Sequence, residues 1–71
     1  MNTTELLSIF RSGDTLTTEE LEKLYHHLKS IADACIGQGD YFKMTFEFAI
    51  RNANRVAECL SARGVNVFEQ G

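Results

Sequence analysis

Proline and tryptophan are missing from this chain of 71 residues, and cysteine and histidine occur only twice each. Without proline, the ends of helices must be set by glycines and capping side chains. Two cysteines cannot build the disulfide framework that holds many small secreted domains together. No apolar run approaches the ~18 residues of a membrane-spanning helix, and no charged-then-apolar leader opens the chain. We therefore expect a cytoplasmic protein with reduced thiols and no membrane partner.

The chain is also short and carries only a small net charge. Its formal charge of −3 lacks the basic footprint that non-specific nucleic-acid binding needs. Its 71 residues allow one small domain, whose core is marginal at this size. Since neither disulfides nor a metal are indicated, oligomerisation or a protein partner is the expected support.

Three helices are predicted by their start and stop signals. Asn2 and Glu5 are spaced as a capping box and begin a short helix over residues 3–12, which Gly13 ends. Thr17 and Glu20 form the strongest start signal, and the helix that they open extends over residues 17–36.

The segment Gly37-Gln38-Gly39 then breaks the helical pattern, and we expect Asp40 to cap a last helix over residues 40–63, which Gly64 ends. The short connection makes the two long helices antiparallel, so the predicted fold is an all-α helical hairpin with a short N-terminal helix. The pattern is lost after Gly64, and we predict that residues 65–71 fray, although Val65, Val67 and Phe68 offer apolar side chains that could fold back.

The seam of the hairpin consists of apolar residues at helical spacing. In the first long helix these are Leu21, Leu24, Tyr25, Leu28, Ile31, Ala32 and Cys35; in the second they are Phe42, Phe46, Ala49, Ile50, Ala53, Val56, Ala57 and Leu60.

The last helix carries a second apolar stripe, here called the flank, which consists of Tyr41, Met44, Phe48 and Cys59. One partner helix cannot cover both stripes. Either the N-terminal helix folds back onto the flank with Leu6, Leu7, Ile9 and Phe10, or the flank is an exposed surface for a second copy or another protein. The two possibilities can coexist.

Candidate chemistry is weak throughout. His26 and His27 are adjacent, so they point about 100° apart on a helix and cannot share a metal ion. The two glycines around Gln38 are explained by a helix-to-helix turn, because no strand precedes them as in a phosphate-binding loop. No nucleophile, base and orienting group converge. We predict no enzymatic activity, no catalytic residue, no metal and no cofactor.

Cys35 and Cys59 are predicted at opposite ends of the hairpin, too far apart for a disulfide. Four basic residues could contact phosphate, but glutamates alternate with several of them on the helix face. These basic residues are Lys43, Arg51, Arg55 and Arg63.

The segment LTTEELEKLYHHLKSIADACIGQGDYFKMTFEFAIRNANRVAECLSARG resembles the small helical-hairpin proteins encoded in the early accessory regions of temperate, lambda-like phages. It covers about two-thirds of the chain. The resemblance rests on size, on the lack of an enzymatic signature and on this helical pattern. It implies a modulator that binds a host protein in the bacterial cytoplasm.

These observations favour a non-enzymatic protein–protein interaction module that binds its partner through Phe10, Tyr41, Met44 and Phe48. The first alternative is a homodimer in which the flanks form a four-helix bundle. The second is a small nucleic-acid-binding regulator that uses the four basic residues.

Overall fold

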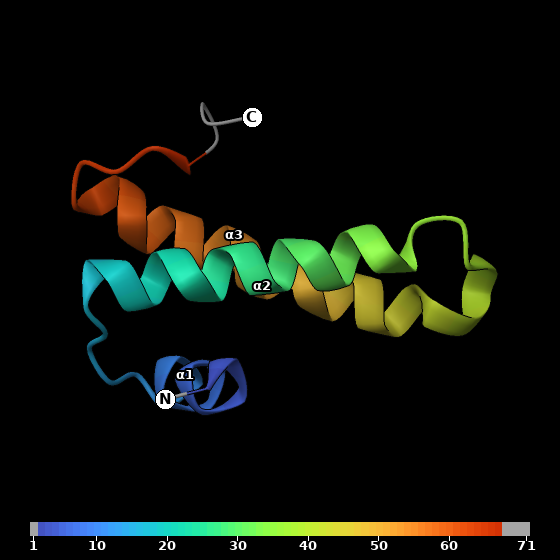
Figure 1. Cartoon of the computed structure of the whole chain (residues 1–71), viewed down its shortest axis with the longest axis horizontal. Helices are drawn as coiled ribbons and strands as arrows, with labels where there is room; N and C mark the ends of the chain where they lie inside the picture. Colours follow the sequence, from blue (N-terminus) through green and yellow to red (C-terminus); the bar gives the residue numbers. More distant parts are fainter. Residues whose placement is uncertain (1, 68–71) are drawn as a thin grey trace.

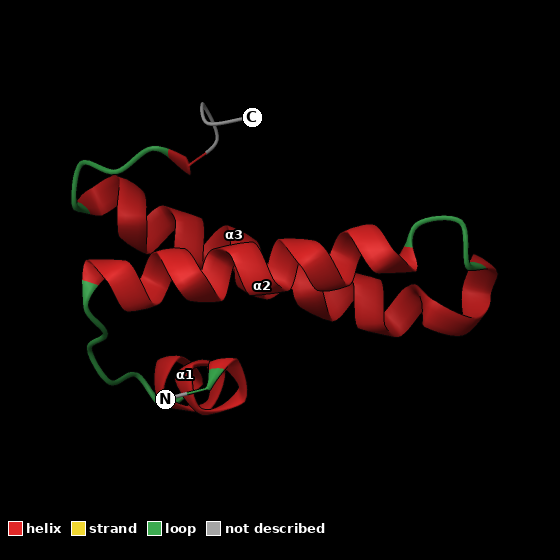
Figure 2. Cartoon of the chain, viewed as in Figure 1, coloured by secondary structure: helices red, strands yellow, loops and turns green. Residues whose placement is uncertain are grey.

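Four helical elements make up the computed structural model, which describes residues 2–67. They are α1 (Thr3–Arg11), α2 (Thr18–Cys35), the 3₁₀ turn η1 (Gly39–Phe42) and α3 (Lys43–Ala62). Within the described residues there is no strand (Figure 2), so the predicted all-α class is confirmed. The predicted helix over residues 3–12 and the first long helix match the observed bounds to within one residue at each end.

The capping box at the start of α2 is present in both directions. The Thr17 backbone N–H donates to Glu20 Oε1 at 2.9 Å, and the Glu20 backbone N–H donates to Thr17 Oγ1 at 3.1 Å. Two N–H groups that a helix start leaves without partners are satisfied in this way, which is why α2 begins where the sequence predicts.

The ends of α1 and α3 also follow from local sequence. At the end of α3, Gly64 adopts a φ of +84°, which lets the Val65 N–H donate to the Leu60 carbonyl at 2.9 Å. The corresponding bond after α1 joins the Asp14 N–H to the Ile9 carbonyl at 3.2 Å, with Gly13 at a φ of +87°. Both are Schellman motifs, in which glycine takes the left-handed position without a steric penalty.

The last helical segment begins with η1, close to the predicted residue 40, but the predicted cap is wrong. Asp40 does not cap α3: it lies inside η1, and the Lys43 N–H donates to its backbone carbonyl. The residue at the cap position is Phe42, which makes no side-chain capping bond. Because a capping residue needs extended backbone, a residue already inside a 3₁₀ turn cannot serve as one.

The two long helices lie side by side and antiparallel (Figure 1), as the short connection predicted. Their core fills the base of the hairpin, where α2 begins and α3 ends. The buried cluster there consists of Leu6, Leu16, Leu21, Leu24, Tyr25, Leu28, Ala53, Val56, Ala57, Leu60 and Val67. The Arg63 guanidinium donates to Thr18 Oγ1 at 3.2 Å and ties the two helix ends together at the base.

Two short segments widen the base on opposite edges of the hairpin (Figure 1). On one edge α1 inserts Leu6 into the core, and on the other the chain after α3 inserts Val67. The prediction of a frayed tail is therefore wrong for Val65, which packs against the core, and for Val67, which is buried. Gly64 reverses the chain at the end of α3, so these apolar side chains return to the hairpin. Residues 68–71, and with them Phe68, lie outside the described residues.

Candidate interaction surface

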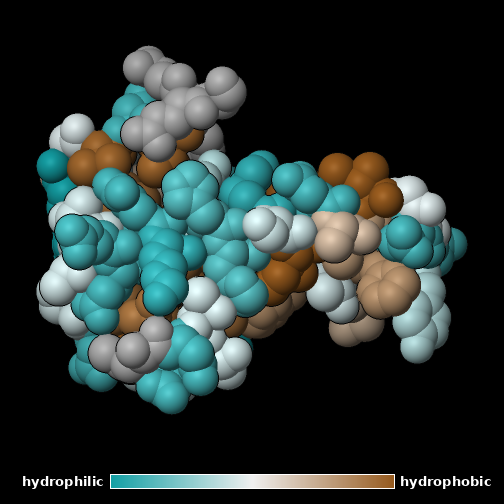
Figure 3. All heavy atoms as spheres, in the orientation of Figure 1, coloured by the Kyte–Doolittle hydropathy of each residue, from teal (hydrophilic) through white to brown (hydrophobic). Residues whose placement is uncertain are grey.

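The end of the hairpin opposite to the base projects without a core of its own. We call residues 33–48 the tip. Not one side chain of the tip is buried, although it carries Ile36, Tyr41, Phe42, Met44 and Phe48 as large apolar residues. The buried residues nearest to the tip are Ala32 on α2 and Ala49 on α3. In the space-filling view, hydrophobic surface gathers on the narrow projecting end (Figure 3).

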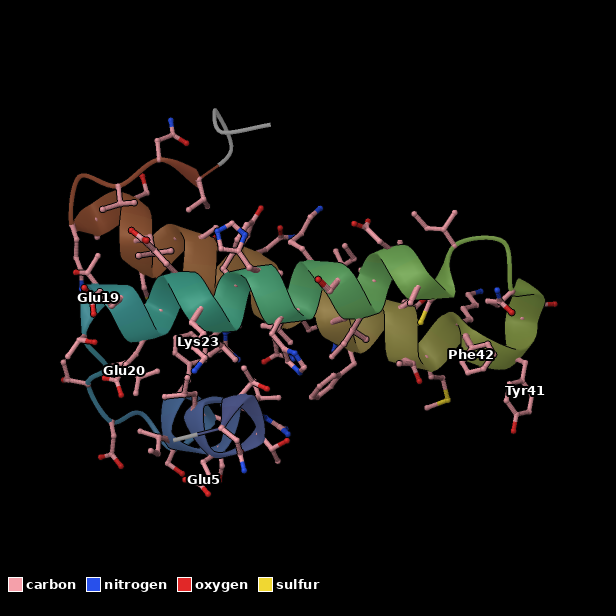
Figure 4. All side chains as sticks on the ribbon, viewed as in Figure 1. Glu5, Glu19, Glu20, Lys23, Tyr41 and Phe42 are labelled. Carbon is pink, nitrogen blue, oxygen red and sulfur yellow. The ribbon has the colours of Figure 1, made fainter. Side chains whose placement is uncertain are left out.

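The predicted flank is split in two by α1. Its distal part, here called the distal flank, consists of Tyr41, Met44 and Phe48. Tyr41 is 88 % exposed, Met44 is 84 % exposed and Phe48 is 38 % exposed. At the end of the hairpin, Tyr41 points away from both long helices (Figure 4). Its ring meets that of Phe42 edge-on, with 4.9 Å between the ring centroids.

The proximal part of the flank lies beside α1. Phe10 and Cys59 line a shared hollow of about 410 Å³ between α1 and α3. Phe10 is half-buried against the core. Of the four predicted partner-binding residues, the structure therefore groups three on the distal flank and places Phe10 apart from them, in the packing of α1.

The boundary between the two parts is a cation–π contact. The Arg11 Cζ lies 5.3 Å from the centroid of the Phe48 ring. This contact explains why Phe48 is less exposed than Met44 one turn earlier. The first possibility is realised in part, since Phe10 of α1 packs against the core while Cys59 stays exposed beside it. The distal flank is exposed, and its binding to a second copy or another protein stays a prediction.

The exposure of two apolar residues of the tip was not predicted from the sequence. Phe42 was assigned to the seam, but η1 turns every three residues and carries its side chain to 38 % exposure. Ile36 leaves the helix with an extended backbone and is 66 % exposed. With Cys35 and Phe46 these residues line a hollow of about 210 Å³. The adjacent Gly37 was the available signal, since α2 had to end beside it.

One buried polar residue was also missed. Asn52 is 5 % exposed, and its Nδ2 donates to the Phe48 carbonyl at 2.9 Å. This bond satisfies the amide inside the helix, as burial of a polar group requires. Sequence patterning assigns asparagine to a solvated face, so it gave no signal for this position.

The residues considered as metal ligands or phosphate contacts are not brought together by the fold. His26 packs edge-on against the neighbouring Tyr25 ring, with 5.6 Å between the centroids. Among residues 2–67, no three His, Cys, Asp or Glu side chains are placed to hold a metal ion. Both cysteines are free thiols, Cys35 at the tip hollow and Cys59 at the hollow beside α1.

The four basic residues are distributed along the whole of α3. Lys43 lines the tip hollow, Arg55 lines the hollow beside α1, and Arg63 is engaged with Thr18 at the base. Residues at the two ends of this helix are separated by roughly 30 Å at about 1.5 Å per residue. They do not form one compact basic cluster.

A comparison of the chain with protein-family models, curated proteins and solved structures finds no match. The resemblance to phage accessory proteins therefore stays a prediction. In the described part of the chain, no helix combines the length and the apolar character that crossing a bilayer requires.

Proposed function

We propose that this protein is a non-enzymatic interaction module that binds another protein chain through the tip of its hairpin. The observation that carries the proposal is the contrast between base and tip. The base buries its apolar side chains against α1 and Val67, whereas the tip exposes five large apolar side chains and leaves a sixth, Phe46, only half-buried. Contiguous exposed apolar surface of this kind marks sites of protein association.

The chemistry of the tip suits such a role. Aromatic residues and methionine are enriched at the cores of protein interfaces, because they bury much area at a modest entropic cost. Met44 adds a flexible side chain that adapts to different partner shapes. The role implied by the phage resemblance, a modulator of a host protein, is the narrower form of this proposal and rests on that resemblance alone.

The proposal is tested by capture from a bacterial lysate with the tagged full-length chain and quantitative mass spectrometry. The test variant is M44D/F48D, which places two carboxylates on the distal flank. The matched control is N54D, an isosteric change on an exposed position of the same helix. Circular dichroism confirms that all three proteins are helical.

We expect a protein that is recovered with the wild type and with N54D, and is lost with M44D/F48D. The captured chain is either a host protein or an untagged copy of this chain, which is co-expressed for the purpose. Equal recovery of every protein by the wild type and the tip variant would overturn the proposal.

A further inference from the structure

We propose that the chain on the distal flank is a second copy of this protein, bound antiparallel with its own distal flank. The two-fold axis passes near Met44, so that Tyr41 of each copy approaches Phe48 of the other. This inference rests on the proposed function and specifies its partner. Three features carry it: the area of the distal flank, the step formed by α1, and the charges along its edge.

The area of the distal flank matches what a small dimer needs. Its three side chains expose on the order of 450 Å² together, if a fully exposed aromatic side chain contributes about 150–250 Å². Homodimer interfaces are about 65 % apolar, so this surface corresponds to roughly 700 Å² per partner. Stable interfaces bury about 800 Å² per partner, which places the expected dimer just below that size.

The position of α1 restricts how a second copy can lie. Arg11 covers one side of Phe48, and toward the base α1 projects beside α3, with a hollow lined by Cys59 between them. A second copy bound parallel along the whole length of α3 would collide with α1. A four-helix bundle in which the hairpins overlap along their full length would require α1 to detach from the hairpin. An antiparallel copy that overlaps only at the tip keeps both α1 helices on the outside of the dimer.

The edge of the distal flank carries charges that complement themselves in this arrangement. Lys43 and Glu47 are exposed, one helical turn apart on the same edge, and within the described residues neither forms an ion pair. In an antiparallel pair of helices, like edges meet. An axis near Met44 therefore sets Lys43 of each copy beside Glu47 of the other and forms two reciprocal ion pairs. Charges along an interface edge fix orientation in this way.

The first test is sedimentation velocity of the purified full-length chain between about 5 and 500 µM, a range that brackets a weak dimer. We expect a reversible monomer–dimer equilibrium with a Kd on the order of 10–100 µM. M44D is expected to raise this Kd by at least about tenfold, and N54D is expected to leave it unchanged. A chain that is monomeric over the whole range would overturn the inference.

The second test exchanges the edge charges between two chains. K43E has two glutamates along the edge and E47K has two lysines, so each variant repels its own copy and is expected to be monomeric. Mixed together, they restore both ion pairs, and we expect a heterodimer with a Kd within about threefold of the wild-type value. Monomers that persist in the mixture would overturn the antiparallel arrangement.

A matched control for the charge exchange lies on α2. K29E and D33K have the same spacing and the same kind of charge changes, but on α2 and outside the distal flank. Each of them alone is expected to dimerise like the wild type. If they behave like K43E and E47K, the effect is one of net charge and the inference falls.

These outcomes separate the inference from the proposed function. If the purified chain is monomeric and still captures a host protein that M44D/F48D loses, the inference falls and the proposed function stands. If the chain is monomeric and the tip variant captures everything that the wild type captures, both fall.

Discussion

The guanidinium of Arg11 lies over the ring of Phe48, with 5.3 Å between Cζ and the ring centroid. This contact joins the last residue of α1 to a residue on α3 that precedes the buried stretch beginning at Ala49. It marks the line between the part of the flank that lies beside α1 and the part that projects beyond it. The position of one short helix therefore decides how much of α3 is open to a partner.

Substitution of Arg11 by alanine is expected to lower the free energy of unfolding by about 0.5–1 kcal/mol, the range for cation–π contacts at exposed sites. The loss should be local, because Leu6 still anchors α1 in the core. Amide hydrogen exchange should speed up in α1 and not in the middle of α2. Unchanged protection of the α1 amides would show that the contact does not hold the helix in place.

The pKa of Glu20 lies below its ordinary value of 4.5, first because the Thr17 backbone N–H donates to its carboxylate and then because the Thr17 hydroxyl also bonds to it. A depressed pKa in the folded state means that the ionised group stabilises the fold above the unfolded pKa. This contribution is lost as the pH falls through the folded pKa. Glu20→Gln should therefore flatten the dependence of stability on pH below about 4.5.

The check is urea unfolding of the wild type and Glu20→Gln at several pH values, with Glu19→Gln as the control from the same helical turn. Glu19 makes no capping bond, so its variant should keep most of the wild-type slope. Equal slopes for the wild type and Glu20→Gln would contradict the prediction.

Asn52→Asp is expected to destabilise the protein at pH 7 by about 2–4 kcal/mol, because a buried carboxylate would face the Phe48 carbonyl without a donor. The cost should shrink as the pH falls and the introduced group takes up a proton. Asn54→Asp makes the same chemical change at an exposed position two residues later. Thermal unfolding of both variants at pH 7 and pH 4 provides the measurement, and equal effects at the two positions would be evidence against burial of Asn52.

Gly39→Ala is expected to cost about 1–2 kcal/mol, because Gly39 holds a φ of +72° that residues with a Cβ adopt only with strain. The Cβ itself meets no atom within 4 Å, so the cost comes from the backbone alone. Gln38→Ala is the control, since its φ of −90° suits any residue. Equilibrium unfolding in urea distinguishes them, and a Gly39→Ala protein as stable as Gln38→Ala would be inconsistent with the turn described here.

Several features of the hairpin were predictable because they depend on neighbours in the sequence. Thr17 and Glu20 satisfy each other across three residues, and Gly64 ends α3 through bonds to the preceding turn. Of the predicted partner-binding residues, Tyr41 and Met44 are exposed as expected, because they face away from a seam that periodicity identifies.

Other features could not be predicted because they depend on segments that come together only in the folded chain. The sequence could not choose between a docked and a free α1, since the docking of Phe10 depends on the path from Gly13 to Leu16. Burial of Asn52 arises where α3 packs against its neighbours, and no local pattern signals it. The 3₁₀ turn η1 contains Asp40 and Phe42, so Asp40 is not a cap and Phe42 is not in the seam. This turn connects the two long helices, and its geometry depends on how they pack.

By itself, the sequence determined the three α-helices, most of their ends and the antiparallel hairpin, because capping bonds, glycine conformations and apolar periodicity act over a few residues. Only the tertiary structure decided which apolar surface is left exposed. Leu6 and Val67 enter the core at the base, and within residues 2–67 the tip is left uncovered except where Arg11 lies over Phe48. The exposure of Tyr41, Met44 and Phe48 thus follows from where distant segments pack.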